Sequence, residues 1–336
     1  YDTAKLSKGG RIFLRSEKTL KLSTEIRKRF DIEKESVTPA ELMNAMLKAR
    51  TDLLWFGGIG TYIKSSAETH ADASDKANDT IRIDGADVRA RVVGEGANLG
   101  VTQRARIEYA EKGGRINTDF LDNSAGVNTS DNEVNIKILL NEIMNDKSSS
   151  MDLKSRNKLL ESMTSEVAAN VLRNNYQQAQ AISLAELQAA ENLLLHEELI
   201  EDLERHEGFK RELEFLPDKK TIAARHRFGK GMTRPELCVL LSYAKIGFTR
   251  DLLNTNIPDN PDMQDWLMDY FPAALRKKFP EEIKKHRLAR EIVATSMANS
   301  LINRMGPAFT KSIMNKTGAT SDAVAKAYII VRDVYN

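Results

Sequence analysis

Cysteine is almost absent from this chain of 336 residues, because Cys238 is the only one. A single cysteine excludes a disulfide-stabilised scaffold, and we expect the reducing compartment of the cytoplasm. Long hydrophobic runs are missing as well, since none reaches the roughly 18 residues of a membrane-spanning helix. The first thirty residues are charged throughout, so we expect no signal peptide. We therefore expect no membrane partner.

An excess of charge of one sign is also missing. Lys and Arg number 50 and Asp and Glu number 48, which gives a formal net charge of +2. This balance gives no general attraction to nucleic acid, although it leaves room for a local charged patch. With 41% hydrophobic residues the chain is not intrinsically disordered, and its length predicts two domains of about 150 residues. It opens on Tyr1 rather than Met, so we expect a piece of a longer protein.

Metal-binding patterns are missing too. The five histidines lack the spacing of metal ligands, so we expect no metal site and surface positions for most of them. They are His70, His196, His206, His226 and His286. Cys238 lies in an apolar helical pattern, which favours packing over reactivity.

Strand-like runs are concentrated in the first part of the chain, and each enters a loop. Residues 52–56 form an apolar run that ends at Gly57 and Gly58. Residues 91–94 enter a second glycine loop, and residues 115–118 form a third short run. Short apolar runs of this kind are typical of buried parallel strands.

Helical patterns separate these runs. Thr38, Pro39 and Glu41 give a capping box with proline in the first turn. Thr102 can cap a second helix, which Gly113 would end. Strands that alternate with helices predict a parallel sheet covered by helices, which is an α/β fold.

Other segments of this region are less regular. Residues 9–15 predict an edge strand, and the polar, Asp-rich segment 65–90 suggests a helix followed by a loop. We expect a third loop over residues 122–129. Asp131 would then cap a helix that runs to about Asn145.

Composition changes at residues 147–150, beyond which glycine is sparse and helical periodicity dominates. Capping boxes at Ser183 and Thr233 would open helices there, and we expect six to eight helices in all. The predicted domains are therefore 1–147, a partial parallel α/β domain, and 148–336, an all-helical domain. The fold class is α/β followed by all-α.

The three loops carry the candidate functional residues, because open α/β sheets bind ligands at the carboxyl ends of their strands. Gly57 and Gly58 would let a ligand approach the backbone, or they form only a tight turn. Asn98 offers a donor and an acceptor to a carboxamide or ribose, or it occupies a left-handed turn. Ser130 could hold a carboxylate at a helix N-terminus, or it only caps that helix. Three such loops favour one shared site.

The sequences of these loops are specific. Residues 95–98 read Glu-Gly-Ala-Asn and are followed by Thr102 at a helix start, and residues 121–130 end in Gly-Val-Asn-Thr-Ser. This set resembles the later part of the dinucleotide domain of glutamate dehydrogenases. Residues 55–64 and 231–237 resemble signatures of the large bacterial NAD-specific enzymes of that family. The resemblance covers nearly the whole chain.

The resemblance implies NAD as the cofactor and L-glutamate and 2-oxoglutarate as substrate and product. It also implies that residues 1–147 are a partial Rossmann-like domain and that the full-length enzyme is a homo-oligomer. The positions that match cofactor-binding residues of the family are Gly57, Gly58, Asn98 and Asn123. Those that match the pocket for the glutamate side-chain carboxylate are Val127 and Ser130.

The family's catalytic lysines and aspartate, and its glycine fingerprint for the pyrophosphate, match no stretch of this chain and would lie upstream. The resemblance therefore implies part of an NAD-dependent glutamate dehydrogenase that has no catalytic residue of its own and is inactive alone. An alternative is a non-catalytic assembly or regulatory module attached to a nucleotide-binding half-domain. Deamination of another amino acid is a further alternative, which a carboxylate contact at Ser130 would argue against.

Overall fold

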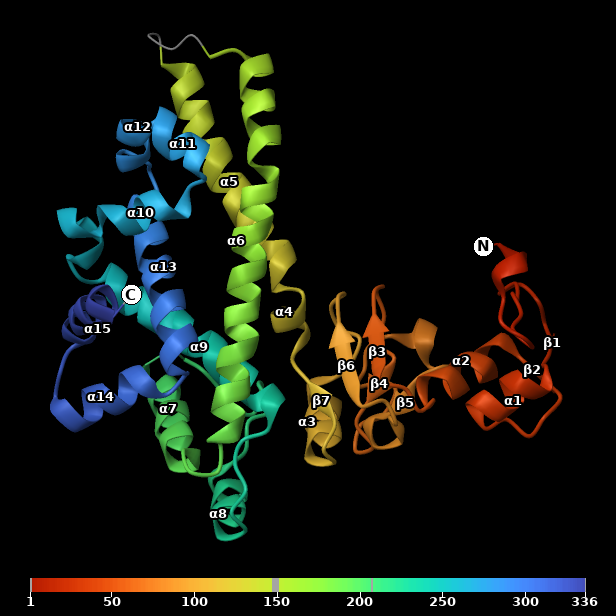
Figure 1. Ribbon diagram of the computed structural model, residues 1–336. Coiled ribbons are helices and arrows are strands. Elements are labelled where there is room, and N and C mark those ends of the chain that lie inside the picture. The colour runs from red at the N-terminus through yellow and green to blue at the C-terminus, as the bar shows by residue number, and fades with distance from the viewer. Residues whose placement is uncertain (1, 147–150, 207, 336) are drawn as a thin grey trace. The chain divides into compact units, whose positions relative to one another are not determined.

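The computed structural model describes residues 2–146, 151–206 and 208–335 (Figure 1). The chain forms two compact units, which are Tyr1–Asn123 with Thr233–Pro235, and Ser124–Met232 with Glu236–Asn336. The domain boundary predicted at residues 147–150 falls outside the described residues. The predicted domain limits therefore stay a prediction, while the compact units divide after Asn123.

The first unit combines short strands with helices. Its strands are β1 (Leu20–Lys21), β2 (Ser36–Val37), β3 (Leu53–Phe56), β4 (Ile63–Lys64), β5 (Ile83–Asp84), β6 (Val92–Glu95) and β7 (Arg115–Ile116). Its helices are α1 (Thr24–Phe30), α2 (Pro39–Leu47), α3 (Gln103–Glu111) and α4 (Asp119–Asp122). Three 3₁₀ turns complete it, η1 (Thr3–Lys5), η2 (Lys76–Asn78) and η3 (Gly85–Asp87).

The central sheet of this unit is parallel and has the order β3-β6-β7. Leu53 pairs with Val92 and Phe56 with Glu95, so β3 and β6 end at the same edge of the sheet. Two smaller sheets join the parallel pair β4-β5 and the antiparallel pair β1-β2. The parallel α/β arrangement expected from the sequence is thereby confirmed.

Only one face of the central sheet is buried. The core on that face joins the sheet to α3 and consists of Phe56, Ile63, Ile83, Ala90, Val93, Val101, Ala105, Tyr109 and Ile116. On the opposite face Leu53 is 52% exposed and Trp55 is 56% exposed. The prediction of a fully buried strand was therefore wrong for β3, because α3 covers only one of its two faces.

Local signals at the helix starts are confirmed. The hydroxyl of Thr38 accepts the N–H of Glu41, and the Glu41 carboxylate accepts the N–H of Thr38 at 2.8 Å. Thr102 caps α3 in the same way, by accepting the N–H of Ala105 at 3.2 Å. Both caps work through contacts three residues apart, which is why the sequence predicts them.

The edge strand predicted over residues 9–15 was wrong. The N–H of Gly10 donates to the carbonyl of Ser7 in a turn, and Gly9 has a left-handed φ of 78°. The apolar side chains of Ile12 and Leu14 are 46% and 64% exposed, so they have no buried face to occupy. A second small core instead gathers around β1, β2 and α2, with Leu20, Leu22, Val37 and Leu42.

The third loop was predicted wrongly as well. The segment 122–129 is helical, since α4 ends at Asp122 and α5 (Ser124–Asn145) starts two residues later. Asp131 therefore lies inside α5 rather than at its N-cap. A glycine costs a helix interior about 1 kcal/mol, and burial of Leu139 and Leu140, both 0% exposed, offsets that cost for α5 as a whole.

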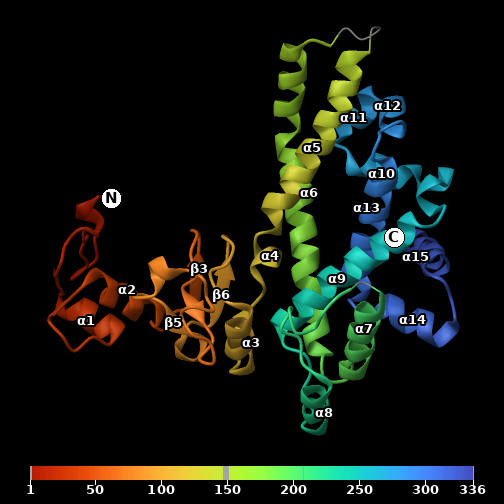
Figure 2. The same cartoon turned by 180° about the vertical axis from the view of Figure 1, so that it is seen from behind.

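The described part of the second unit consists of helices joined by loops, without a strand (Figure 2). After α5 come α6 (Leu153–Leu187), α7 (Leu193–His206), α8 (Lys219–Arg227), α9 (Arg234–Leu253), α10 (Gln264–Tyr270), α11 (Ala273–Lys278), α12 (Pro280–Lys284), α13 (Ala289–Met305), α14 (Phe309–Thr317) and α15 (Ser321–Tyr335). Two 3₁₀ turns, η4 (Ile257–Asp259) and η5 (Pro261–Met263), precede α10. The all-α prediction is confirmed, with more helices than the six to eight expected.

Long helices pack side by side in this unit, with α6 against both α5 and α13 (Figures 1 and 2). The helix start predicted at Ser183 was wrong, because α6 continues through it and its hydroxyl donates to the Ala179 carbonyl at 2.9 Å. Cys238 is buried, as predicted for a packing residue. Surface positions were wrong for His196 and His286, which are 2% and 3% exposed.

Candidate functional site

The carboxyl edge of the central sheet brings two of the predicted loops together. β3 and β6 are parallel and end at the paired residues Phe56 and Glu95, so the loops that start at Gly57 and Gly96 leave the sheet side by side. The N–H groups of Gly96 and Ala97 both donate to the Phe56 carbonyl, at 2.9 and 3.1 Å. These hydrogen bonds hold the second loop against the end of β3.

Asn98 and Asn123 meet at this edge. Asn123 ends α4, where its N–H donates to the Asp119 carbonyl at 2.9 Å. Its side-chain amide nitrogen donates to the side-chain oxygen of Asn98. Asn98 is exposed, so its remaining donor capacity faces solvent. The two residues predicted to approach a nicotinamide ribose thus lie in direct contact in the first unit.

Backbone strain in the second loop falls on Leu99 rather than on Asn98. Leu99 has a φ of 66°, a left-handed conformation that costs a non-glycine residue about 1 kcal/mol or more. Its N–H donates to the Asp119 carboxylate at 2.8 Å, which fixes the strained turn. The left-handed conformation considered for Asn98 is therefore adopted by the next residue, Leu99.

A buried ion pair lies directly beneath this loop. Arg106 of α3 donates to the Glu95 carboxylate through two nitrogens, at 2.7 and 2.9 Å. Glu95 also accepts the Val101 N–H at 3.0 Å, and Arg106 lies 3.3 Å from Asp119. Burial raises the pKa of the Glu95 carboxyl, while the Arg106 guanidinium acts in the opposite direction. Both ends of the loop are thereby fastened to α3 and α4.

Asp122 fastens the start of the loop from the other side. Its carboxylate accepts the Glu95 N–H at 3.0 Å and the Asn117 amide at 2.7 Å. Burial raises the pKa of the Asp122 carboxyl. Within the same compact unit, the Arg234 guanidinium donates to the Asn117 side-chain oxygen at 2.6 Å.

Sequence reasoning missed Arg106, Asp119 and Asp122 as supports of the loop. A signal existed for Arg106, since it follows Thr102 by one helical turn and precedes Tyr109 on the same face of α3. A charged residue on an otherwise apolar helix face indicates a buried partner. The identity of that partner, Glu95, could not be read from the sequence.

The glycines after β3 differ in whether the fold leaves space for a side chain at their positions. A Cβ on Gly58 would meet nothing within 4 Å, and one on Gly57 would lie 3.6 Å from the Trp55 indole nitrogen. Gly60 is constrained instead, because its φ is 139° and an added Cβ would lie only 2.7 Å from Asn78. Folding therefore requires glycine at Gly60 and leaves open space above Gly58.

Trp55 explains two other glycines. A Cβ on Gly94 would lie 2.6 Å from the indole ring, and one on Gly96 would lie 2.4 Å from it. Ring atoms within a rigid indole cannot move aside separately, so only glycine fits beneath Trp55. The indole thus lies over the end of β6, beside the Gly57 loop, with 56% of its residue surface exposed.

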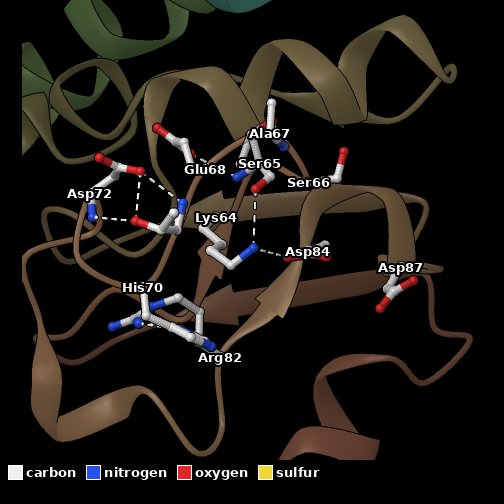
Figure 3. A network of polar contacts seen from close by, with 12 residues as sticks. Lys64, Ser65, Ser66, Ala67, Glu68, His70, Asp72, Arg82, Asp84 and Asp87 are labelled. Carbon is white, nitrogen blue, oxygen red and sulfur yellow. Dashed lines mark hydrogen bonds and ion pairs between the residues drawn. The ribbon is translucent and has the colours of Figure 1, made fainter.

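A polar network fixes the connection between β3 and β6 (Figure 3). The Arg82 side chain is fully buried, and it donates to the Thr61 carbonyl at 2.8 Å and to the Asp79 carboxylate at 2.5 Å. Lys64 pairs with Asp84 across the β4-β5 pair. This segment, for which a helix and a loop were expected, consists instead of turns and short strands.

The same network reaches α3. Glu68 accepts a hydrogen bond from the Ser65 N–H at 2.8 Å and one from the Thr102 hydroxyl at 2.5 Å. Figure 3 labels Glu68 and Ser65. Thr102 follows the loop that carries Asn98, so the connection segment helps to place that loop.

Val127 and Ser130 lie in the second unit, in the first two turns of α5. They are three residues apart and share one helix face, where both are exposed. The prediction that Ser130 directly precedes a helix N-terminus was wrong, because α5 already begins at Ser124. Their role toward a carboxylate stays a prediction.

Neither a membrane span nor a metal cluster is found among the described residues. No helix there is both long enough and apolar enough to cross a membrane. No group of three or more His, Cys, Asp or Glu side chains among them is arranged to hold a metal ion.

Comparison with known proteins gives a consistent result. Residues 1–185 match the family described as bacterial NAD-glutamate dehydrogenase, catalytic domain, and residues 229–336 match glutamate dehydrogenase, C-terminal. The chain is 50% identical over 336 residues to the NAD-specific glutamate dehydrogenase of Pseudomonas aeruginosa. It is 47% identical to that of Halomonas elongata and 41% identical to that of Mycobacterium tuberculosis. These matches cover 100% of the chain and 21% of each relative.

Proposed function

Because the chain belongs to the bacterial NAD-glutamate dehydrogenase family, we propose that it supplies part of the NAD site and part of the glutamate pocket of such an enzyme. The reaction converts L-glutamate, NAD⁺ and water into 2-oxoglutarate, ammonium, NADH and a proton. The chain spans about one fifth of the length of its curated relatives, 21% of each. Its proposed contribution is therefore to one part of the whole enzyme.

The contact between Asn98 and Asn123 carries this proposal. It lies where the parallel strands β3 and β6 end, and open α/β sheets bind nucleotides at that edge. The exposed Asn98 amide can pair with a carboxamide, which presents the same donor and acceptor. The space above Gly58 would admit a ribose or phosphate to the backbone. The residues present therefore fit a nicotinamide nucleotide.

Each residue has a positioning role in this account. NAD⁺, when bound, accepts the hydride from the glutamate α-carbon. Asn98 would orient the nicotinamide carboxamide, with Asn123 holding the Asn98 side chain in place. Gly57 and Gly58 would leave room for the ribose. The turn at Leu99 holds the backbone next to Asn98 before binding, which would lower the entropic cost of alignment.

Val127 and Ser130 would form one wall of the substrate pocket. The Val127 side chain can pack against the methylene groups of glutamate, and the Ser130 hydroxyl can donate to its side-chain carboxylate. Their shared, exposed face on α5 supports this role. We assign no catalytic residue to this chain, and we expect the proton-transfer groups elsewhere in the full-length enzyme.

The setting of the enzyme follows from the same proposal. We propose a Rossmann-like first unit, glutamate catabolism as the pathway, a homo-oligomeric full-length enzyme and a cytoplasmic location. The single cysteine supports a reducing compartment.

NADH binding by Asn98→Ala tests the cofactor assignment. Loss of one amide hydrogen bond should weaken NADH binding about five- to tenfold in calorimetry. The matched control is Asn141→Ala, an exposed asparagine of α5, which should bind NADH like the unchanged chain. Equal NADH affinity of the Asn98→Ala variant and the unchanged chain would remove the assignment.

A further inference from the structure

The amino edge of the central sheet, opposite the proposed cofactor edge, carries a basic groove. Two neighbouring hollows of about 600 and 620 Å³ form it, and Arg89 lines both. The second hollow lies where β3, β6 and β7 begin. The groove is defined by its charged lining residues, which are Glu25, Lys28, Arg29, Asp31, Arg50, Asp52, Arg89, Arg91, Lys112 and Arg115.

Positive charge is concentrated in this groove. Seven of its lining residues are Lys or Arg and three are Asp or Glu, an excess of four, whereas the whole chain has a net charge of +2. The remainder of the chain is therefore slightly acidic. Such a local contrast attracts multivalent anions to one place on the surface.

Only part of this charge is neutralised within the chain. Arg89 pairs with Asp31 at 2.8 Å, and Arg91 lies 3.3 Å from Asp52. Within the described ranges no ion pair is found for the other five cations of the groove, and all five are exposed. Their side chains repel one another, so an anion bound between them would relieve that repulsion.

The lining favours phosphate over other anionic groups. Five of its seven cations are arginines, whose planar fork matches phosphate oxygens in pairs. Tyr109 is the aromatic residue of the lining, but it is 3% exposed and its hydroxyl donates to the Ala90 carbonyl at 2.7 Å. The groove therefore offers no aromatic surface on which a nucleic acid base could stack.

We propose that this basic groove binds an oligophosphate, meaning a linear anion with several linked phosphate groups. Arg89, shared by the two hollows, would contact phosphates on both sides. The groove is separate from the proposed NAD site, because Gly57 and Asn98 follow the carboxyl ends of β3 and β6. Binding there does not depend on the proposed enzymatic function.

Calorimetry with tripolyphosphate tests the proposal on the 336-residue chain. The informative variant is Arg50→Gln combined with Arg115→Gln, one residue from each hollow. Its tripolyphosphate affinity should fall at least about tenfold, as the loss of two charge-assisted contacts predicts. Both residues are exposed, and circular dichroism would verify that the variant is folded.

The matched control removes the same charge from the second unit, by Lys277→Gln combined with Lys285→Gln, both exposed. The control should bind tripolyphosphate like the unchanged chain, and the groove variant should keep its NADH affinity. A pentaglutamate peptide should bind the unchanged chain much more weakly than tripolyphosphate. The proposal is overturned by absent tripolyphosphate binding, by equal losses in both variants, or by equally tight binding of pentaglutamate.

Discussion

The guanidinium of Arg106 donates two hydrogen bonds, of 2.7 and 2.9 Å, to the carboxylate of Glu95, and both side chains are buried. The pair joins α3 to the end of β6, directly beneath the loop that carries Asn98. A buried ion pair is costly to break from one side, because the remaining charge then has no partner. The position of the loop therefore depends on this ion pair, and loss of either partner should destabilise the loop.

Arg106→Leu should destabilise the first unit strongly. It leaves the Glu95 carboxylate buried without its guanidinium, at a cost of about 3–5 kcal/mol in the free energy of unfolding. Urea unfolding followed by circular dichroism measures this loss. Arg104→Leu, on the exposed side of α3, is the control and should change stability by less than about 0.5 kcal/mol. A similar loss in both variants would contradict the role assigned to the pair.

Gly96→Ala should disturb Trp55, because the added Cβ would lie 2.4 Å from the indole. We expect a destabilisation of about 1–3 kcal/mol and a shift of the Trp55 fluorescence. Gly58→Ala is the matched comparison, since its Cβ meets open space, and its stability should not change. If Gly58→Ala also leaves NADH affinity unchanged, the space above Gly58 has no role in cofactor binding.

Lys245→Met should stabilise the second unit. Burial lowers the pKa of the Lys245 amine to about 7, and the amine donates to the neutral Gln178 side chain at 2.9 Å. Because the unfolded lysine holds its proton up to a higher pH, stability falls as the pH decreases from about 10 to 7 and then levels off. The variant should remove that slope and gain roughly 3 kcal/mol in the free energy of unfolding at pH 7.

The control for Lys245→Met is Lys154→Met, an exposed lysine of α6. It removes the same charge and should retain the pH slope of the unchanged chain. Thermal unfolding at several pH values between about 7 and 10 compares the three proteins. An unchanged slope in the Lys245 variant would show that this amine is protonated in the folded state throughout the range.

His196→Leu should flatten the stability profile on the acid side. Burial lowers the pKa of His196 to about 4, and its Nδ1 atom is buried without a hydrogen-bond partner among the described residues. As the pH decreases below 6.5, the ordinary pKa of histidine, His196 binds a proton in the unfolded state but not in the folded state. The free energy of unfolding therefore decreases until about pH 4. At about pH 4.5 the free energy of unfolding of the variant, measured by urea unfolding, should exceed that of the unchanged chain by about 2 kcal/mol.

His226→Leu, an exposed histidine of α8, provides the control and should keep the acid slope. Parallel profiles for the His196 variant and the unchanged chain would mean that the folded protein accepts the proton at His196 without cost.

Features that depend on neighbouring residues could be predicted from the sequence. The capping box of Thr38 and Glu41 is complete within four residues, and the strand β3 ends where Gly57 follows it. The parallel arrangement of the sheet was predicted from the alternation of strands with helices, but the pairing of β3 with β6 was not. These features need no knowledge of distant contacts.

Features that depend on distant packing could not be predicted. Residues 122–129 have the composition of a loop, yet α5 forms because Leu139 and Leu140 are buried within the helical unit. The carboxylate that pairs with Arg106 and the Thr61 carbonyl that accepts from Arg82 lie in other segments, so the sequence does not identify these partners. The exposure of Trp55 could not be predicted for the same reason, since an apolar run does not show which face of the strand is covered.

Fluorescence of Trp55 during NADH titration reports on cofactor binding at the carboxyl edge of the sheet. The chain has two tryptophans, so Trp266→Phe leaves Trp55 as the sole indole. Its ring nitrogen is 3.6 Å from the position that a Cβ added to Gly57 would take. NADH bound at this edge should quench Trp55 by energy transfer, and Asn98→Ala should shift the quenching to about five- to tenfold higher NADH concentration. Unquenched Trp55 at saturating NADH, or the same titration midpoint with and without Asn98→Ala, would contradict the proposed cofactor site.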